Sequence, residues 1–255
     1  MVEQDIVITS IDLKLPPDPE EEYVTPYNSF LAIVISFMLW AIFYQCMRFL
    51  LPSKCREYHC RLLSFLHGII SAFVGVNQCF IIDVPFQHPE WRTTSSQRFL
   101  MVCSLGYFIH DLGWILLYDR NSKLMIAHHV YSAFALQRML YKPNSGAQAT
   151  CALGCMEITN PLLQTRWFLR SEGFYPSSVF TSVELTFFLV FFLVRILLGT
   201  YFLVVIAFQP KNDWDFRILS LSIYVMSWMF LINMSKYFVH KYGLGCRGLE
   251  ILISP

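Results

Sequence analysis

Seven long apolar stretches constrain the fold of this chain more than any other feature. They cover residues 28–49, 61–82, 99–118, 124–141, 147–169, 178–208 and 216–238. A helix needs about 20 apolar residues to cross the hydrocarbon core of a bilayer. The chain is 55% hydrophobic and 15% charged, whereas soluble domains carry about 25% charged residues. We therefore predict an all-α, polytopic transmembrane helix bundle with about seven spans.

The distribution of charge predicts the orientation of these spans. Residues 1–27 carry seven acidic side chains against one lysine, Lys14. Cationic residues follow the first span, at Arg48, Lys54, Arg56 and Arg61, and recur at Lys241 and Arg247. Cytosolic loops of membrane proteins carry the excess of Lys and Arg. We therefore expect the N-terminus outside or in a lumen and the C-terminus in the cytosol. The net charge of +1 gives no indication of a nucleic-acid partner.

The eight cysteines fall mostly within the apolar stretches or on the predicted cytosolic side. Cys-x-x-Cys pairs do not occur, so we predict no disulfide framework and expect most cysteines to pack as small apolar residues. The acidic N-terminus lacks the basic start of a cleaved signal peptide, and we expect none.

A layer of polar residues is predicted inside the bundle. Counted from the turn at Asn121, Asp111 lies 10 residues before it, and His128 and His129 lie 7 and 8 after it. At 1.5 Å per residue these side chains reach similar depths. The next turn brings Glu157 to the same level. Ionisable groups at membrane depth are costly and usually mark a functional site.

The same count adds His67 and Glu184 to this layer, in the cytosolic half of the bilayer. A carboxylate beside an imidazole fixes the tautomer of the ring and suits it to acid–base chemistry. The alternative is that these groups only bond helices to one another. Neighbouring helical side chains point about 100° apart, so only one histidine of the pair can face a cavity squarely. Ser132 shares the face of His128 and is a candidate hydrogen-bond partner.

Two further features lie near the predicted layer. Pro161 removes a backbone hydrogen bond, so we expect a kink near Glu157. Arg195 lies deep in the sixth stretch. It is predicted either to hold a lipid phosphate or to extend to the outer interface.

Five short motifs resemble the TLC domain. They are Gly106–Phe108, Asp111–Trp114, Ala127–Ser132, Glu157–Leu162 and Arg166–Leu169. The resemblance divides the chain into an acidic outer tail (1–27), a first span with its cytosolic loop (28–56), a TLC domain (57–241) and a cytosolic tail (242–255).

Ceramide synthases share this domain, and the resemblance implies acyl-transfer roles for His128 and His129. Asp111 and Glu157, which the depth count places near them, are further candidate catalytic residues that would orient a histidine. Ceramide synthases also carry a His-Asp-x-x-Asp segment on the next span. In this chain Met156 occupies the position of the His in that segment, and Asn160 occupies the position of its second acid. An acyl transfer that needs both acids would not run unchanged here.

The leading hypothesis is a protein of lipid homeostasis that binds an acyl chain or lipid in a polar intramembrane cavity. In this hypothesis the protein need not catalyse a reaction. Its candidate lipid-binding residues are His67, Ser132, Asn160, Glu184 and Arg195. The alternative is an N-acyltransferase that uses acyl-CoA as co-substrate; otherwise no cofactor and no metal is expected. A metal-dependent lipid hydrolase, with zinc on His67, Asp111 and His128, and a transporter or cargo receptor rank lower. The resemblance favours the endoplasmic reticulum membrane, with the plasma membrane second.

Overall fold

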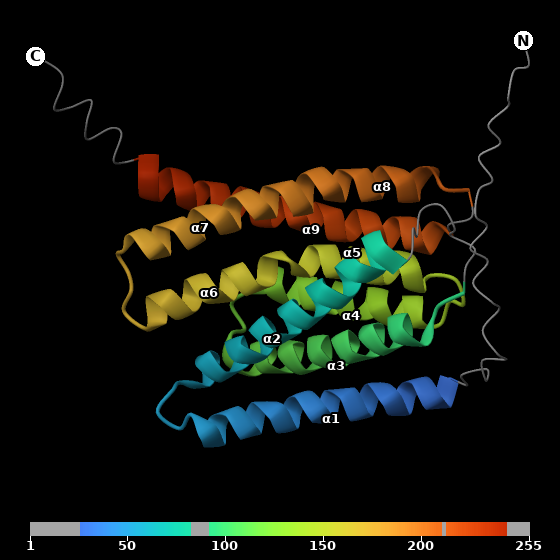
Figure 1. Ribbon diagram of the computed structural model, residues 1–255, viewed down its shortest axis with the longest axis horizontal. Helices are drawn as coiled ribbons and strands as arrows, with labels where there is room; N and C mark the ends of the chain where they lie inside the picture. The colour runs from blue at the N-terminus through green and yellow to red at the C-terminus, as the bar shows by residue number, and fades with distance from the viewer. Residues whose placement is uncertain (1–25, 83–91, 211–212, 244–255) are drawn as a thin grey trace, which may run out of the picture.

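The computed structural model describes residues 26–82, 92–210 and 213–243, and the secondary structure of this part is all helical. The elements form one bundle of nearly aligned helices (Figure 1). In chain order they are α1 (Pro26–Leu50), α2 (Arg56–Asn77), η1 (Gln78–Ile82), α3 (Ser95–Tyr118), α4 (Lys123–Leu140), α5 (Gly146–Glu157), α6 (Thr159–Ser171), α7 (Ser178–Phe191), η2 (Phe192–Leu198), α8 (Gly199–Phe208), α9 (Trp214–Phe238) and η3 (Val239–Gly243). The three η elements are π-helical.

The predicted all-α membrane class is confirmed, and every predicted stretch is helical. Five helical segments are long and apolar enough to cross a membrane: Ser29–Leu50, Arg56–Phe80, Ser95–Tyr118, Ser178–Phe208 and Trp214–Gly243. The other two predicted spans correspond to α4 and to the α5–α6 pair, which carry many of the polar site residues. The count of seven spans and the orientation remain predictions. Most of the two predicted tails lies outside the described residues.

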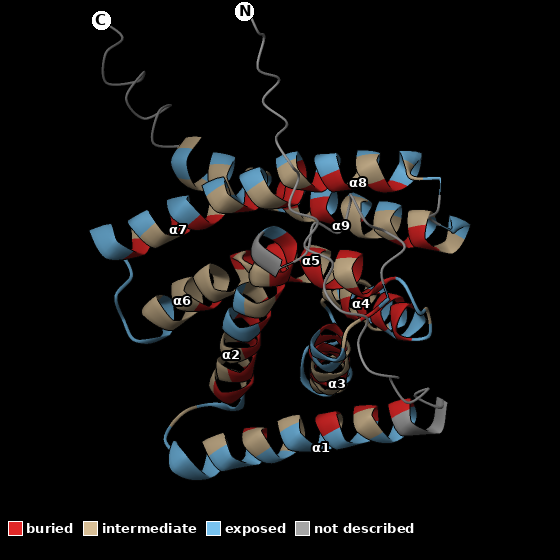
Figure 2. Ribbon diagram, turned by 45° about the vertical axis from the view of Figure 1, so that its right-hand side comes forward, coloured by how far each residue is buried: buried red, intermediate tan, exposed pale blue. Residues whose placement is uncertain are grey.

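The site-bearing helices lie in the middle of the bundle. α1 flanks one side and α7, α8 and α9 the other, with α2 to α6 between them (Figure 1). Buried positions face inward, while the outer faces of α1, α7 and α8 are largely exposed (Figure 2). Large apolar side chains such as Leu39, Phe73 and Leu189 point outward, as expected of a surface that meets lipid tails.

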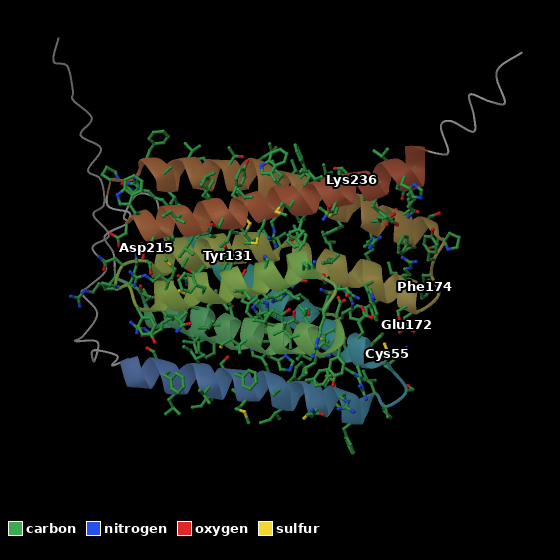
Figure 3. The ribbon with its side chains drawn as sticks, turned by 180° about the vertical axis from the view of Figure 1, so that it is seen from behind. Cys55, Tyr131, Glu172, Phe174, Asp215 and Lys236 are labelled. Atoms are coloured by element: carbon green, nitrogen blue, oxygen red, sulfur yellow. A yellow bond between two sulfur atoms is a disulfide. The ribbon has the colours of Figure 1, made fainter. Side chains whose placement is uncertain are left out.

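Ion pairs mark the two ends of the bundle. At one end, Lys54 Nζ lies 2.5 Å from Glu172 Oε1 and joins the α1–α2 loop to the end of α6. At the other end, Lys142 Nζ lies 2.7 Å from Asp213 Oδ2 and joins the α4–α5 loop to the start of α9. Cys55, Glu172 and Phe174 gather at one end and Asp215 at the other (Figure 3). The α1–α2 loop and the end of α6 therefore lie at one end of the bundle, and the α4–α5 loop and the start of α9 lie at the other.

Two glycines allow α2 and α5 to cross at backbone contact. A Cβ placed on Gly75 would lie 2.5 Å from Gly154 Cα, and a Cβ on Gly154 would clash with Gly75 in return. Small residues at such crossings let membrane helices pack by close van der Waals contact. This crossing sets how near the polar side chains of α2 come to those of α5 and α6.

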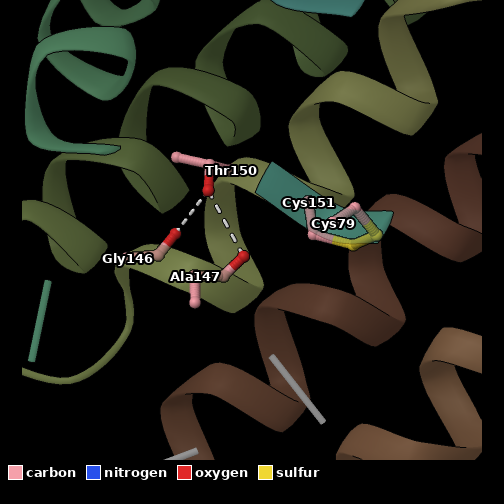
Figure 4. The surroundings of a disulfide bond; sticks show 5 residues. All are labelled: Cys79, Gly146, Ala147, Thr150 and Cys151. Carbon is pink, nitrogen blue, oxygen red and sulfur yellow. Dashed lines mark hydrogen bonds between the residues drawn. A yellow bond between two sulfur atoms is a disulfide. The ribbon is translucent and has the colours of Figure 1, made fainter. Parts of the chain in front are cut away.

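A disulfide joins the same two helical segments and corrects the prediction of no disulfide framework. Cys79 in η1 is bonded to Cys151 in α5, across 72 residues of sequence (Figure 4). The search for closely spaced pairs missed it because the two cysteines meet only through the crossing at Gly75 and Gly154. The neighbouring Thr150 donates from Oγ1 to the carbonyl of Gly146 at 2.8 Å.

We predict that Gly154→Ala destabilises the protein by about 1–3 kcal/mol. The added methyl group would clash with backbone atoms of Gly75, which cannot move away by a side-chain rotation. Thermal unfolding in detergent micelles measures the change. The matched control is Gly113→Ala in α3, where an added Cβ would meet nothing within 4 Å. The control should be neutral or up to about 1 kcal/mol more stable. Equal melting temperatures for the two variants would contradict the close crossing.

Candidate functional site

The first buried pair of the site joins α3 to α4. His129 Nε2 lies 3.1 Å from Asp111 Oδ2. Both side chains are buried, at 4% and 6% exposure. The other carboxylate oxygen of Asp111 accepts a hydrogen bond from the Cys60 thiol of α2 at 3.1 Å. Asp111 thus ties three helices together and holds the imidazole of His129 in one orientation.

The second pair joins α2 to the break between α5 and α6. His67 Nδ1 lies 3.6 Å from Glu157 Oε2, slightly beyond hydrogen-bond distance. Asn160 Nδ2 donates to the same carboxylate oxygen at 3.0 Å and to the carbonyl of Ser64 at 3.1 Å. α5 ends at Glu157 and α6 begins at Thr159, so the helix is interrupted next to Glu157, where the sequence predicted a kink from Pro161.

The two nitrogens of His67 face different partners. Its Nε2 lies 3.1 Å from Ser104 Oγ and 3.0 Å from Ser71 Oγ. The ring of Tyr107 stacks on the imidazole with centroids 3.9 Å apart. These contacts fix the ring plane and direct Nδ1 toward Glu157.

A line of polar side chains leads from Glu157 to the membrane edge. Gln164 Nε2 donates to Asn160 Oδ1 at 2.8 Å, and Arg61 donates from its NH1 group to Gln164 Oε1 at 3.0 Å. Arg61 also donates to Glu57 at 2.8 Å. Arginine stays protonated and amides relay protons poorly. This line therefore positions the carboxylate rather than conducting protons.

Several of these partners escaped the sequence analysis although a signal existed. Polar residues recur along α2 at helical spacing, at Cys60, Ser64, His67 and Ser71. Side chains three or four residues apart share one helix face. A polar stripe of this kind on an otherwise apolar span indicates a face turned toward polar neighbours.

Glu184 does not join the other predicted residues. Its carboxylate accepts from Arg166 Nε at 2.8 Å and from the hydroxyls of Tyr242 and Tyr237 at 2.7 and 3.1 Å, and it pairs with Lys241. The predicted single layer is therefore divided into the two histidine–acid pairs and a separate cluster on α6, α7, α9 and η3. The depth count could not foresee this, because it gives a height in the membrane and not the identity of the neighbouring helix.

The adjacent histidines have different neighbours, because consecutive side chains on a helix point about 100° apart. His128 turns away from Asp111, with its ring 5.6 Å from that of Phe230 and 6.3 Å from that of Phe108. Its Nδ1 is buried and has no hydrogen-bond partner among the described residues. Ser132 lies one turn further along the same face, but the hydrogen bonds within the described ranges include none between the two side chains.

A cavity of about 110 Å³ opens beside His128, between α3, α4, α5, α8, α9 and η2. Its polar lining comes from His128, Ser132, Ser220, Glu157 and Arg195. Most of the remaining wall is apolar and includes Phe108, Leu136, Met139, Leu153, Met156 and Phe216. Arg195 is buried at 8% exposure, so it does not extend to the outer interface.

The side chains best placed to bind a metal ion lie outside the two histidine–acid pairs. Within the described ranges, the cluster whose three donor atoms all lie within 4.8 Å is Cys79, Cys151 and Cys155. Two of these sulfur atoms are already joined in the disulfide. The zinc alternative on His67, Asp111 and His128 gains no support from this arrangement.

The ion pair at the membrane edge shifts the titration of both partners. The hydrogen bond from Lys54 holds the pKa of Glu172 below its ordinary value. The same bond raises the pKa of Lys54 above its ordinary value. Both groups are therefore charged over a wider pH range, which keeps the loop before α2 joined to the end of α6.

Comparison with known proteins identifies the domain. The family model of the TLC domain (TRAM/LAG1/CLN8) matches residues 57–242. This protein belongs to the TLC domain family. The match covers every helix that contributes to the candidate site, and it leaves α1 outside. The TLC resemblance inferred from the motifs is thereby confirmed.

Two of the relatives that match this chain are similar to it at low identity. Human TLC domain-containing protein 4 is 27% identical over 149 residues, which is 56% of each chain. Zebrafish TLC domain-containing protein 4-B is 24% identical over 152 residues, 57% of this chain and 56% of its own. The chain thus spans slightly more than half the length of these relatives. The motifs had suggested the branch of TLC domain-containing protein 5, but the relatives found are of protein 4, so the assignment is to the family.

We predict that Asn160→Asp destabilises this TLC domain, although an acid at this position would restore the second acid of the ceramide synthase pattern. The new carboxylate would lose the donation to Ser64 and lie against Glu157, at a cost of about 1–3 kcal/mol. Thermal unfolding at neutral pH measures it. Asn77→Asp is the control, because Asn77 makes only an exposed bond to its own helix. An unchanged melting temperature for Asn160→Asp would refute the bridging role of the amide.

Proposed function

We propose that this protein acts in membrane lipid homeostasis by binding an acyl chain or lipid in the cavity beside His128. The observation that carries the proposal is the composition of that cavity. Apolar walls suit hydrocarbon, while His128, Glu157 and Arg195 add polar contacts to the lining. Ligand sites in proteins combine these two features, a mainly apolar wall with a few placed polar groups.

Membership of the TLC family supports a lipid ligand, and we propose a membrane lipid or fatty acyl group as the partner. The endoplasmic reticulum membrane is the proposed location, with the plasma membrane as the alternative. Binding needs no catalytic step, and the proposal requires no metal and no cofactor.

We predict that Ala152→Phe abolishes lipid retention, because Ala152 lines the cavity and the added ring would fill it. Native mass spectrometry of protein released from mild detergent would show a stoichiometric lipid adduct in the unmodified protein and its loss in the variant. The control is Ala207→Phe, since Ala207 is exposed on α8 next to the cavity residue Ile206. Retention of the same adduct by Ala152→Phe would overturn the proposal.

A specific contact favours acyl transfer as a second candidate function. A histidine held by a buried acid, as His129 is by Asp111, is the arrangement of a general base. In that reaction the base would take a proton from an amine. The amine nitrogen would bond to the acyl carbon of acyl-CoA, the carbon–sulfur bond would break, and the departing CoA thiolate would take up the proton.

For this second candidate we expect amide formation from labelled acyl-CoA and a long-chain amine, detected by mass spectrometry. His129→Ala should then lower turnover by about 100-fold or more, the usual contribution of a positioned base. Lipid binding without any amide product from the unmodified protein would exclude this candidate and leave the binding proposal intact.

A further inference from the structure

Arg195 is a buried cation without a direct counter-ion. Its side chain is 8% exposed, and its Nε has no hydrogen-bond partner among the described residues. No acid in the described ranges lies within ion-pair distance of its guanidinium group, which lies 5.6 Å from the centre of the Phe191 ring. The charge of Glu157, in the same cavity lining, acts on it from a longer distance. A buried charge is normally paired, because removing it from water costs several kcal/mol. The cavity that Arg195 lines is where a partner can enter.

The fold directs Arg195 into the cavity through a local irregularity. The arginine lies in η2, a π-helical segment between α7 and α8. Such segments widen the helix and occur frequently at functional sites. The nearest candidate acid, Glu157, lines the same cavity but accepts a hydrogen bond from Asn160 and faces His67. Both contacts are made by Oε2 of Glu157, so this oxygen is turned toward Asn160 and His67, and Glu157 makes no direct ion pair with Arg195.

A second unpaired polar atom lines the same cavity. The Nδ1 of His128 is buried and unpartnered within the described ranges. Beyond these two side chains, residues such as Leu136, Leu153 and Ile206 supply apolar wall. The lining therefore combines the guanidinium group of Arg195 and the imidazole of His128 with apolar side chains that can contact hydrocarbon.

We propose that the ligand is a single-chain fatty acid whose carboxylate binds the guanidinium of Arg195, with the imidazole of His128 as a second polar contact. This deepens the proposed function and rests on it. Arginine binds a carboxylate through two parallel hydrogen bonds. The described lining residues include one arginine and one acid, Glu157, so the cavity has no surplus of positive charge for a head group with two negative charges. This favours a carboxylate over a phosphate monoester.

The size of the cavity agrees with a small head group. Its volume of about 110 Å³ is below the ~150 Å³ of a protein cavity that holds one benzene molecule. A carboxyl group and its first few carbons fit such a space. The rest of a long chain must leave between the helices toward the bilayer, and a bulky phosphodiester head group is excluded.

The test compares three photoreactive probes of equal chain length, a fatty acid, its alcohol and a lysophosphatidate, in phosphatidylcholine nanodiscs at mildly alkaline pH. Labelled peptides are mapped by mass spectrometry, and competition by the unlabelled lipid gives relative affinities. The acid should label α4, α5 or α8 and bind on the order of tenfold or more tighter than the alcohol, as expected for a charge-assisted pair. A lysophosphatidate that binds tighter than the acid would overturn the carboxylate assignment.

Two variants locate the recognition. Arg195→Gln should reduce the preference for the acid over the alcohol to near unity, while Arg195→Lys, which keeps the charge but loses the fork, should retain part of it. The comparison of probes in the unmodified protein stands even if a variant fails to fold. Equal labelling by acid and alcohol, both blocked by Ala152→Phe, would reject the fatty-acid inference and keep the lipid-binding proposal. No labelling of the cavity by any probe would reject both.

Discussion

The cost of removing charged and polar groups from water determines how the helices pack in the interior of this bundle. Asp111 is held by His129 and Cys60, and Glu157 by Asn160 with His67 close by. Each contact joins different helices, so the polar groups stabilise the bundle only as a set. Hydrocarbon cannot supply alternative partners, and a helix that moved away would leave a buried acid unpaired. The helices that carry these groups therefore lie at the centre, and the lipid-facing helices surround them.

The glycine crossing of α2 and α5 makes this set possible. Backbone contact at Gly75 and Gly154 brings the polar stripe of α2 beside the break between α5 and α6. The disulfide of Cys79 and Cys151 joins the same two segments on the other side of the crossing from the acids. With larger residues at the crossing, the helices would separate and His67 would lie farther from Glu157 than 3.6 Å.

The comparison with ceramide synthases is most informative where the pattern departs. Asn160, which replaces the second acid of the resemblance, donates to Glu157 and to a backbone carbonyl of α2. An ionised acid could donate neither bond, so the amide has a structural role in this chain. Here an amide that bridges two helices takes the place of the second acid of the resemblance, and Met156 takes the place of its histidine. The histidine pair is present, and the cavity lies beside His128.

The sequence by itself determined the membrane helix class, the positions of the helices and the break before Pro161, because hydrophobic length and proline geometry act locally. It also placed Asp111 and Glu157 at the depth of the histidines, since rise per residue is constant. The tertiary structure decided that His129 pairs with Asp111, that Glu184 accepts a hydrogen bond from Arg166, and that Arg195 is buried beside a cavity. A count along one helix gives height and face, but the neighbour across the interface depends on how all the helices pack. The disulfide escaped prediction for the same reason, as its two cysteines meet only where the packed helices cross.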